Sequence, residues 1–186
     1  PYLYAPKNLI NIVIFPDVHL LFDKMGSLSA GNYSNYPPAS QYIFRLAAFF
    51  SQHHLLDGVV ILRLIYFIGE LFLFFFGISF LKKLRFDPLN IAWYFLNPLV
   101  IIEGIGNLHG ESLMCCFMLI SLFFLIQKRG VIGGLFMGIA VAIKLLPLLI
   151  IPIFYKYLGW RKFSLFCLGI GLSSVFFWVS FWEGNM

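Results

Sequence analysis

Asn97-Pro-Leu-Val-Ile-Ile-Glu-Gly-Ile-Gly-Asn-Leu-His-Gly-Glu-Ser112 is the stretch around which this chain is organised. It separates two strongly apolar runs, Leu89–Leu96 and Leu113–Ile126. Within ten residues it nevertheless carries Glu103, Asn107, His109 and Glu111. Ionisable groups at membrane depth are costly, so they usually face partners or a water-filled cavity. A plain polar loop is the alternative, and the depth at which these side chains are expected favours a functional site.

The composition indicates a polytopic membrane protein. Of 186 residues, 61% are hydrophobic and 19% aromatic, while only 11% are charged. A soluble domain of this size has no need for so much apolar surface. Both ends of the sequence read as loop, so we expect a fragment of a longer protein. The three cysteines, Cys115, Cys116 and Cys167, lie in apolar runs without metal-binding spacing and are expected to be buried thiols.

Basic clusters orient the chain. The net charge of +5 comes mainly from short clusters beside apolar runs: Lys82, Lys83 and Arg85; Lys128 and Arg129; Lys156, Arg161 and Lys162. Such clusters mark cytoplasmic ends of membrane spans rather than a nucleic-acid surface.

An all-α membrane bundle follows from this pattern. Residues 1–57 are predicted to form an extracytoplasmic loop with an interfacial helix at about 39–51. Residues 58–182 are predicted to form the bundle. Its six expected spans are 58–81, 88–102, 112–126, 131–144, 145–157 and 163–181. One long span over 131–157 is the alternative, and it would place the last basic cluster outside.

Four charged residues from different spans are expected at nearly the same depth in the membrane. With a rise of ~1.5 Å per residue, they stand roughly 22 to 28 Å from the nearest basic cluster: Arg63, Glu103, Glu111 and Lys144. A structural ion-pair network would explain this alignment. A polar cavity that opens outward and receives an anionic lipid headgroup explains it as well and is the preferred interpretation. Glu70, about two turns deeper, is expected to pair within the bundle.

A series of short motifs resembles a known family. The motifs follow a Pro-Tyr at the start of the chain and are, in order, Tyr36-Pro-Pro, Arg63-Leu, Asn97-Pro-Leu, Asn107-x-x-x-Glu111-Ser and Gly138-Ile-Ala-Val-Ala-Ile-Lys144-x-x-Pro147. Each motif is weak alone, and their order gives the specificity. The chain thereby resembles the integral-membrane GT-C glycosyltransferases. Within them it is similar to the polyprenyl-phosphate-mannose-dependent mannosyltransferases, which include the catalytic subunit of GPI mannosyltransferase I and bacterial relatives.

The resemblance implies a GT-C-like fold and a defined reaction. A mannosyl or other hexosyl group would pass from a polyprenyl-phosphate sugar donor to a lipid- or protein-linked glycan acceptor. The reaction would take place on the extracytoplasmic face of a multi-pass integral membrane protein. The membrane would be the bacterial inner (plasma) membrane, or the ER membrane in a eukaryote. Membrane lipids are expected partners and nucleic acid is not. The family's main catalytic acid would lie on an outer loop upstream of Pro1.

Glycosyl transfer needs a base for the acceptor hydroxyl and positive groups for the leaving phosphate. Glu111, which matches the motif, and Glu103 are the catalytic candidates in this chain. Substrate- or phosphate-binding roles are expected for six residues: Arg63, Lys144, Asn107, His109, Tyr36 and Gln41. No cofactor and no metal ligand set is assigned, and a divalent metal is left open. A lipid or small-solute transporter or flippase, or a non-catalytic membrane subunit, is the alternative function.

Overall fold

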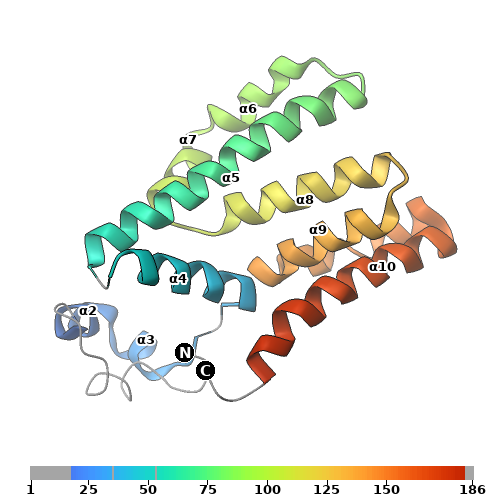
Figure 1. Ribbon diagram of the computed structural model, residues 1–186. Helices are drawn as coiled ribbons and strands as arrows, with labels where there is room; N and C mark the ends of the chain where they lie inside the picture. The colour runs from blue at the N-terminus through green and yellow to red at the C-terminus, as the bar shows by residue number, and fades with distance from the viewer. Residues whose placement is uncertain (1–17, 35, 53, 183–186) are drawn as a thin grey trace.

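The computed structural model describes residues 18–34, 36–52 and 54–182, and these form helices and turns without a strand (Figure 1). The predicted all-α class is confirmed. The first part of the predicted outer loop, residues 1–17, lies outside the described residues. The helices are α2 Val18–Met25, α3 Ser27–Gly31, α4 Pro38–Phe50, α5 Leu55–Lys83, η1 Pro88–Ile91, α6 Ala92–Phe95, α7 Pro98–Val100, η2 Ile101–Gly106, α8 Glu111–Ile126, α9 Gly130–Ile143, η3 Leu146–Leu149 and α10 Ile153–Trp182.

Two of the described helices are long and apolar enough to cross a membrane: α5 and the Ile153–Val179 part of α10. A third crossing is present if the bent pair Pro88–Phe95 and Pro98–Gly106 counts as one span. α8 and α9 are apolar but have only 16 and 14 residues, against about 20 for a full crossing. The protein is therefore membrane-compatible, and the six-span topology stays a prediction.

The predicted helix over 88–102 is not continuous. It consists of η1, α6, α7 and η2, with a bend of 60° between the two halves. The break lies at Asn97, whose backbone is extended because Pro98 disfavours helical geometry in the residue before it. The Asn97 side chain then accepts a hydrogen bond of 3.0 Å from the backbone N–H of Leu99, which starts the next helix. The bend redirects the chain toward the polar stretch.

α9 and the long second part of α10 pack closely and run in the same direction. A Cβ on Gly134 would lie 3.0 Å from the Cα of Gly169, and a Cβ on Gly138 would lie 3.1 Å from the Cα of Ile170. Residue numbers therefore increase in the same direction along the two helices, so the helices are parallel, as Figure 1 also shows. Glycine is required at these contacts because the two backbones approach too closely for a side chain.

A parallel pair requires that the chain between them returns along the bundle. The predicted span 145–157 occupies this return but is not one helix. Pro147 and Pro152 lack the N–H groups that a helix needs, so the segment forms η3, a turn and the first part of α10. α10 is itself broken at Gly159, where φ is +69°. The alternative of one long span over 131–157 is not one continuous helix either, because α9 ends at Ile143.

α4 lies beside the end of α9. Its first turn contains Pro38, a position that tolerates proline. The buried hydroxyl of Ser40 donates a hydrogen bond of 2.8 Å to the carbonyl oxygen of Ile143. Ala39, Met114 and Ile143 are buried together, which joins α4, α8 and α9 in one apolar cluster. The predicted helix at about 39–51 is thus present, and its position at the membrane interface stays a prediction.

Candidate functional site: a polar network between η2, α8 and α9

The site begins with an irregular turn of helix. Residues Ile101–Gly106 form a π-helix, η2, and the N–H of Asn107 donates a hydrogen bond of 2.8 Å to the carbonyl oxygen of Ile102, five residues earlier. Single π-helical turns are rare and frequently occur at functional sites. Leu108 follows with φ +58°, a left-handed conformation that costs roughly 1 kcal/mol in a non-glycine residue. The backbone is therefore shaped to present Glu103, Asn107 and His109.

Gly104 allows η2 to lie directly against α5 and α8. A Cβ at this position would collide with the Ser112 hydroxyl and stand 3.3 Å from Glu70 Oε1. Glu70 is only 4% exposed, and its Oε1 accepts a hydrogen bond of 3.3 Å from the Tyr94 hydroxyl. Its Oε2 is buried and has no hydrogen-bond partner among the described residues. A buried carboxyl group thus packs against the π-helical turn at Gly104.

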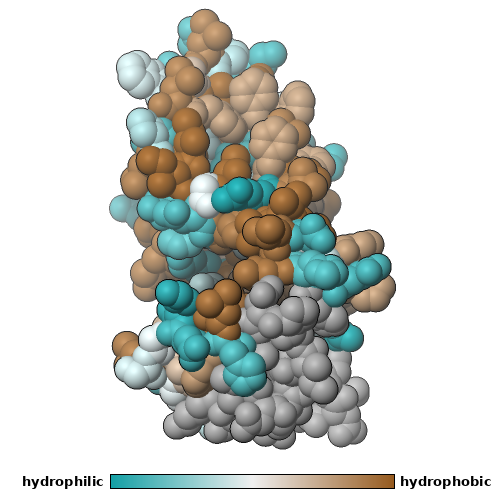
Figure 2. Space-filling view, turned by 90° about the vertical axis from the view of Figure 1, so that its left-hand side faces the viewer, coloured by the Kyte–Doolittle hydropathy of each residue, from teal (hydrophilic) through white to brown (hydrophobic). Residues whose placement is uncertain are grey.

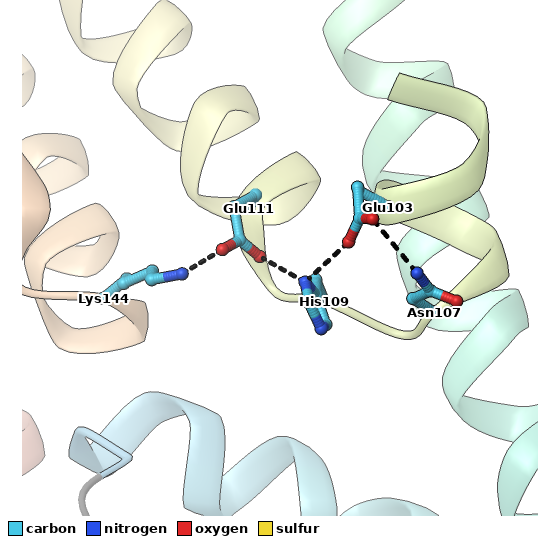
Figure 3. A network of polar contacts seen from close by, with 5 residues as sticks. All are labelled: Glu103, Asn107, His109, Glu111 and Lys144. Carbon is cyan, nitrogen blue, oxygen red and sulfur yellow. Dashed lines mark hydrogen bonds and ion pairs between the residues drawn. The ribbon is translucent and has the colours of Figure 1, made fainter. Parts of the chain in front are cut away.

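Five side chains form a connected network above this support (Figure 3). Asn107 Nδ2 donates to Glu103 Oε1 at 3.1 Å. His109 Nδ1 lies between the two carboxylates, 3.1 Å from Glu103 Oε2 and 3.9 Å from Glu111 Oε2. The Lys144 ammonium forms an ion pair with Glu111. The network therefore joins η2, the following loop, the start of α8 and the end of α9.

Lys144 reaches Glu111 because α9 stops directly before it. The backbone of Lys144 is extended, with φ −150° and ψ 136°, so its side chain leaves the helix cylinder. Gly110 brings the loop before Glu111 close to this end, since a Cβ there would lie 3.4 Å from the Ile143 side chain. Two helix ends that are 33 residues apart in sequence therefore hold opposite charges together.

The network is half-exposed. The side chains of Glu111, Glu103, Lys144 and His109 are between 37% and 51% accessible to solvent. Figure 2 looks onto the face where α4 and α7 lie and shows hydrophilic residues gathered among apolar ones across its middle. Partial burial acts to raise the pKa of the Glu111 carboxyl, but the hydrogen bond and charge of Lys144 outweigh it. The pKa of Glu111 therefore lies below its usual value.

The other predicted site residues lie apart from the network. Arg63 is exposed on α5 and makes no hydrogen bond or ion pair with the described residues. Tyr36 is 52% exposed and packs edge-on against Phe44, with ring centroids 5.2 Å apart. Gln41 is 9% exposed, and its Nε2 donates to the Ser34 hydroxyl at 2.5 Å. The structure thus joins Lys144, but not Arg63, to the two carboxylates.

Sequence reasoning missed the residues beneath the network. Tyr94 lies in an apolar run, where hydropathy alone gives no sign of a polar partner. Ser112 enters the sequence analysis only as the end of a motif, and Glu70 is expected there only to pair within the bundle. A glycine at position 104, shortly before the Asn-Leu-His-Gly sequence, is the signal that the backbone could approach another element closely there. Among the described residues, no group of three His, Cys, Asp or Glu side chains is arranged to hold a metal ion.

Comparison with known proteins supports one family. The chain is 31% identical to GPI mannosyltransferase 1 of Debaryomyces hansenii over 135 residues, which are 69% of this chain. It is 36% identical to GPI mannosyltransferase 1 of Saccharomyces cerevisiae over 90 residues, 44% of this chain. It is 34% identical to Alpha-(1->6)-mannopyranosyltransferase A of Corynebacterium glutamicum over 68 residues, 37% of this chain.

The chain corresponds to a minor part of these relatives. The matched stretches make up 27%, 22% and 14% of the full length of the three proteins, in the same order. No solved structure was found to match the chain. The model of the Alpha-(1->6)-mannopyranosyltransferase N-terminal domain matches residues 11–159, which include every residue of the polar network. The chain therefore belongs to the alpha-(1->6)-mannopyranosyltransferase family, in the part that this N-terminal domain describes.

Proposed function

We propose that this chain is the part of a membrane mannosyltransferase that holds a polyprenyl-phosphate-linked sugar donor. Family membership supports mannose, or a related hexose, as the transferred group. The observation that carries the proposal is the half-exposed ion pair between Lys144 and Glu111, at the end of two apolar helices. A cation in this position suits an anionic phosphate group that arrives from the lipid phase.

The donor phosphate would replace the Glu111 carboxylate as the partner of Lys144. During transfer, the bond between the anomeric carbon and the phosphate oxygen breaks, and negative charge develops on the phosphate. The Lys144 ammonium would stabilise that charge where it forms. The acceptor hydroxyl oxygen forms the new bond to the anomeric carbon, and a carboxylate takes its proton. Polyprenyl phosphate leaves.

Two candidates exist for the base that takes this proton. Glu111 is the first, because the arriving phosphate would release it from Lys144 at the moment a base is needed. The second is the acidic residue that the family resemblance places upstream of Pro1. Glu103, held by Asn107 and His109, would then orient sugar hydroxyls. Arg63 would approach the phosphate from α5, and Tyr36 and Gln41 would line the entrance beside α4.

Sidedness is a further part of the proposal. The polar network lies at the start of α8 and the end of α9, whereas Lys128 and Arg129 lie in the turn at their other ends. Basic residues favour the cytoplasmic side, which supports an extracytoplasmic position of the network. The glycan acceptor would be reached there, from a multi-pass protein in the bacterial inner membrane or the ER membrane.

Reconstituted full-length protein tests the donor. Vesicles would receive either polyprenyl-phosphate mannose or a nucleotide-linked mannose, together with a glycan acceptor, and mannose incorporation would be measured. We expect incorporation from the polyprenyl-phosphate donor only. Lys144→Met should strongly reduce it, while Lys128→Met, at the opposite end of the helices, should retain it. Incorporation from the nucleotide sugar alone would contradict the proposal.

A further inference from the structure

Five exposed cations at the end of the protein opposite the polar network are here named the basic patch. The basic patch consists of Lys128, Arg129, Lys156, Arg161 and Lys162. Two different turns supply these residues: the α8–α9 turn, and the break in α10 at Gly159. Nothing in the proposed transfer reaction uses this end of the molecule.

Packing of α9 on α10 brings the two turns together. A Cβ on Gly130, directly after Arg129, would lie 3.3 Å from the carbonyl oxygen of Lys162. The positive φ of Gly159 folds the first part of α10 back against the second. Tyr155 consequently packs against Phe163, with ring centroids 5.4 Å apart. Lys156 is thereby held on the same end of the molecule as the other four cations.

The charge of the basic patch is not balanced within the described part of the chain. The sequence contains no Asp or Glu between Ser112 and Trp182. None of the five cations forms an ion pair with a described residue. Like charges that are held together by a rigid helix packing repel each other, so an anion bound from outside would lower the energy of this arrangement.

Exposed apolar side chains flank the basic patch. Tyr157 and Trp160 are each 71% exposed, and on the following turns Leu165 and Leu168 are 48% and 53% exposed. Aromatic rings of this kind lie at the headgroup level of a bilayer, and the leucines beyond them suit acyl chains. A free phosphate ion would gain nothing from contact with this apolar surface. A lipid would contact both the cations and the apolar residues.

We propose that the basic patch is a binding site for the phosphate headgroup of an anionic phospholipid. The headgroup lies between the α8–α9 turn and the break at Gly159, with Trp160 beside it and the acyl chains along the exposed leucines of α10. The site is separate from the donor site, so its occupancy does not depend on the proposed transfer reaction.

Trp160 provides a direct probe of this site. The full-length protein, with every other tryptophan changed to phenylalanine, would be placed in nanodiscs with brominated phosphatidylglycerol or brominated phosphatidylcholine. Bromine quenches tryptophan fluorescence on contact. We expect a several-fold preference of the Trp160 site for the anionic lipid. Each neutralised cation should reduce that preference by up to about fivefold.

Matched variants separate the site from general electrostatic attraction. Lys156→Gln, Arg161→Gln and Lys162→Gln together should remove the preference. Lys82→Gln with Lys83→Gln, which removes charge at the end of α5 instead, should keep it. Arg161→Lys with Lys162→Arg preserves charge and should also keep it, which shows that the fold survives changes here. Equal quenching by both lipids, or displacement of the anionic lipid by millimolar inorganic phosphate, would overturn the proposal.

Discussion

The Lys144 ammonium lies against the Glu111 carboxylate and so links the end of α9 to the start of α8. The pair is half-exposed, with side-chain accessibilities of 48% and 37%. An ion pair that solvent reaches contributes little to stability, about 0 to 1 kcal/mol. Its position at one end of a polar network in an apolar chain agrees with the proposed ligand, which would exchange with one partner of the pair.

Gly104→Ala should destabilise the protein by about 1 to 3 kcal/mol. The added methyl group would collide with the Ser112 hydroxyl and press on Glu70, so these buried side chains or η2 would have to shift. Thermal unfolding in detergent would measure the change. Gly106→Ala is the matched control in the same π-helix, because a Cβ there lies 3.6 Å from its nearest neighbour, an ordinary contact. Equal unfolding temperatures for both variants would contradict the close approach of η2 to α8.

Gly134→Ala tests the parallel packing of α9 on α10. A Cβ at Gly134 would collide with the carbonyl oxygen of Phe166, which is backbone and cannot rotate away. We expect a loss of about 1 to 3 kcal/mol in the free energy of unfolding. Gly171→Ala, on the other side of α10, meets no atom within 4 Å and should be neutral or slightly stabilising. If Gly134→Ala were equally well tolerated, the two helices would not be packed as described.

The predicted sidedness can be tested with single cysteines. They would be introduced at Ser29, Gln127 and Gly159 in a background without Cys115, Cys116 and Cys167, and intact cells would be treated with an impermeant thiol reagent. The basic clusters predict labelling at Ser29 only. After permeabilisation, the other two positions should react as well. Labelling of Gln127 or Gly159, but not Ser29, in intact cells would reverse the orientation.

Arg63→Met should weaken donor binding without disturbing the polar network. Arg63 makes no hydrogen bond or ion pair with the network residues, so Glu111, Lys144 and Glu103 should keep their arrangement. We expect the KM for the donor to rise about tenfold or more, since an ion pair with a phosphate is lost, with an unchanged unfolding temperature. If the variant kept the wild-type KM for the donor, Arg63 would not be part of the donor site. A loss of folded protein would show that Arg63 is structural.

Much of the helix pattern could be predicted from hydropathy and basic clusters. The expected helices at 58–81, 112–126 and 131–144 correspond to α5, α8 and α9 with ends shifted by three residues at most. These boundaries follow from apolar runs that end at charged or glycine residues. The bend at Asn97 was not predicted, although Pro98 was visible, because local hydropathy continues through it.

The polar network could be predicted only in part. Counting residues along the helices predicts that Glu103, Glu111 and Lys144 lie at the same depth in the membrane. In the structure His109 lies between the two carboxylates, and Lys144 pairs with Glu111. Arg63 shares that level but not the network. Counting residues along a helix gives the height of a side chain, whereas the direction in which it points depends on how the helices pack. The buried position of Glu70 beneath Gly104 depends on packing in the same way.

The central claim is that the donor phosphate replaces Glu111 as the partner of Lys144, and the KM for the donor tests it most directly. Glu111→Gln removes the carboxylate that competes with the phosphate, so the KM for polyprenyl-phosphate mannose should fall while kcat falls as well. Lys144→Met removes the phosphate partner, so KM should rise, and Lys144→Arg should restore part of the binding. Opposite shifts of KM in the first two variants are the predicted result. Shifts in the same direction, with a similar loss of folded protein in both, would show that the ion pair is structural and contradict the account.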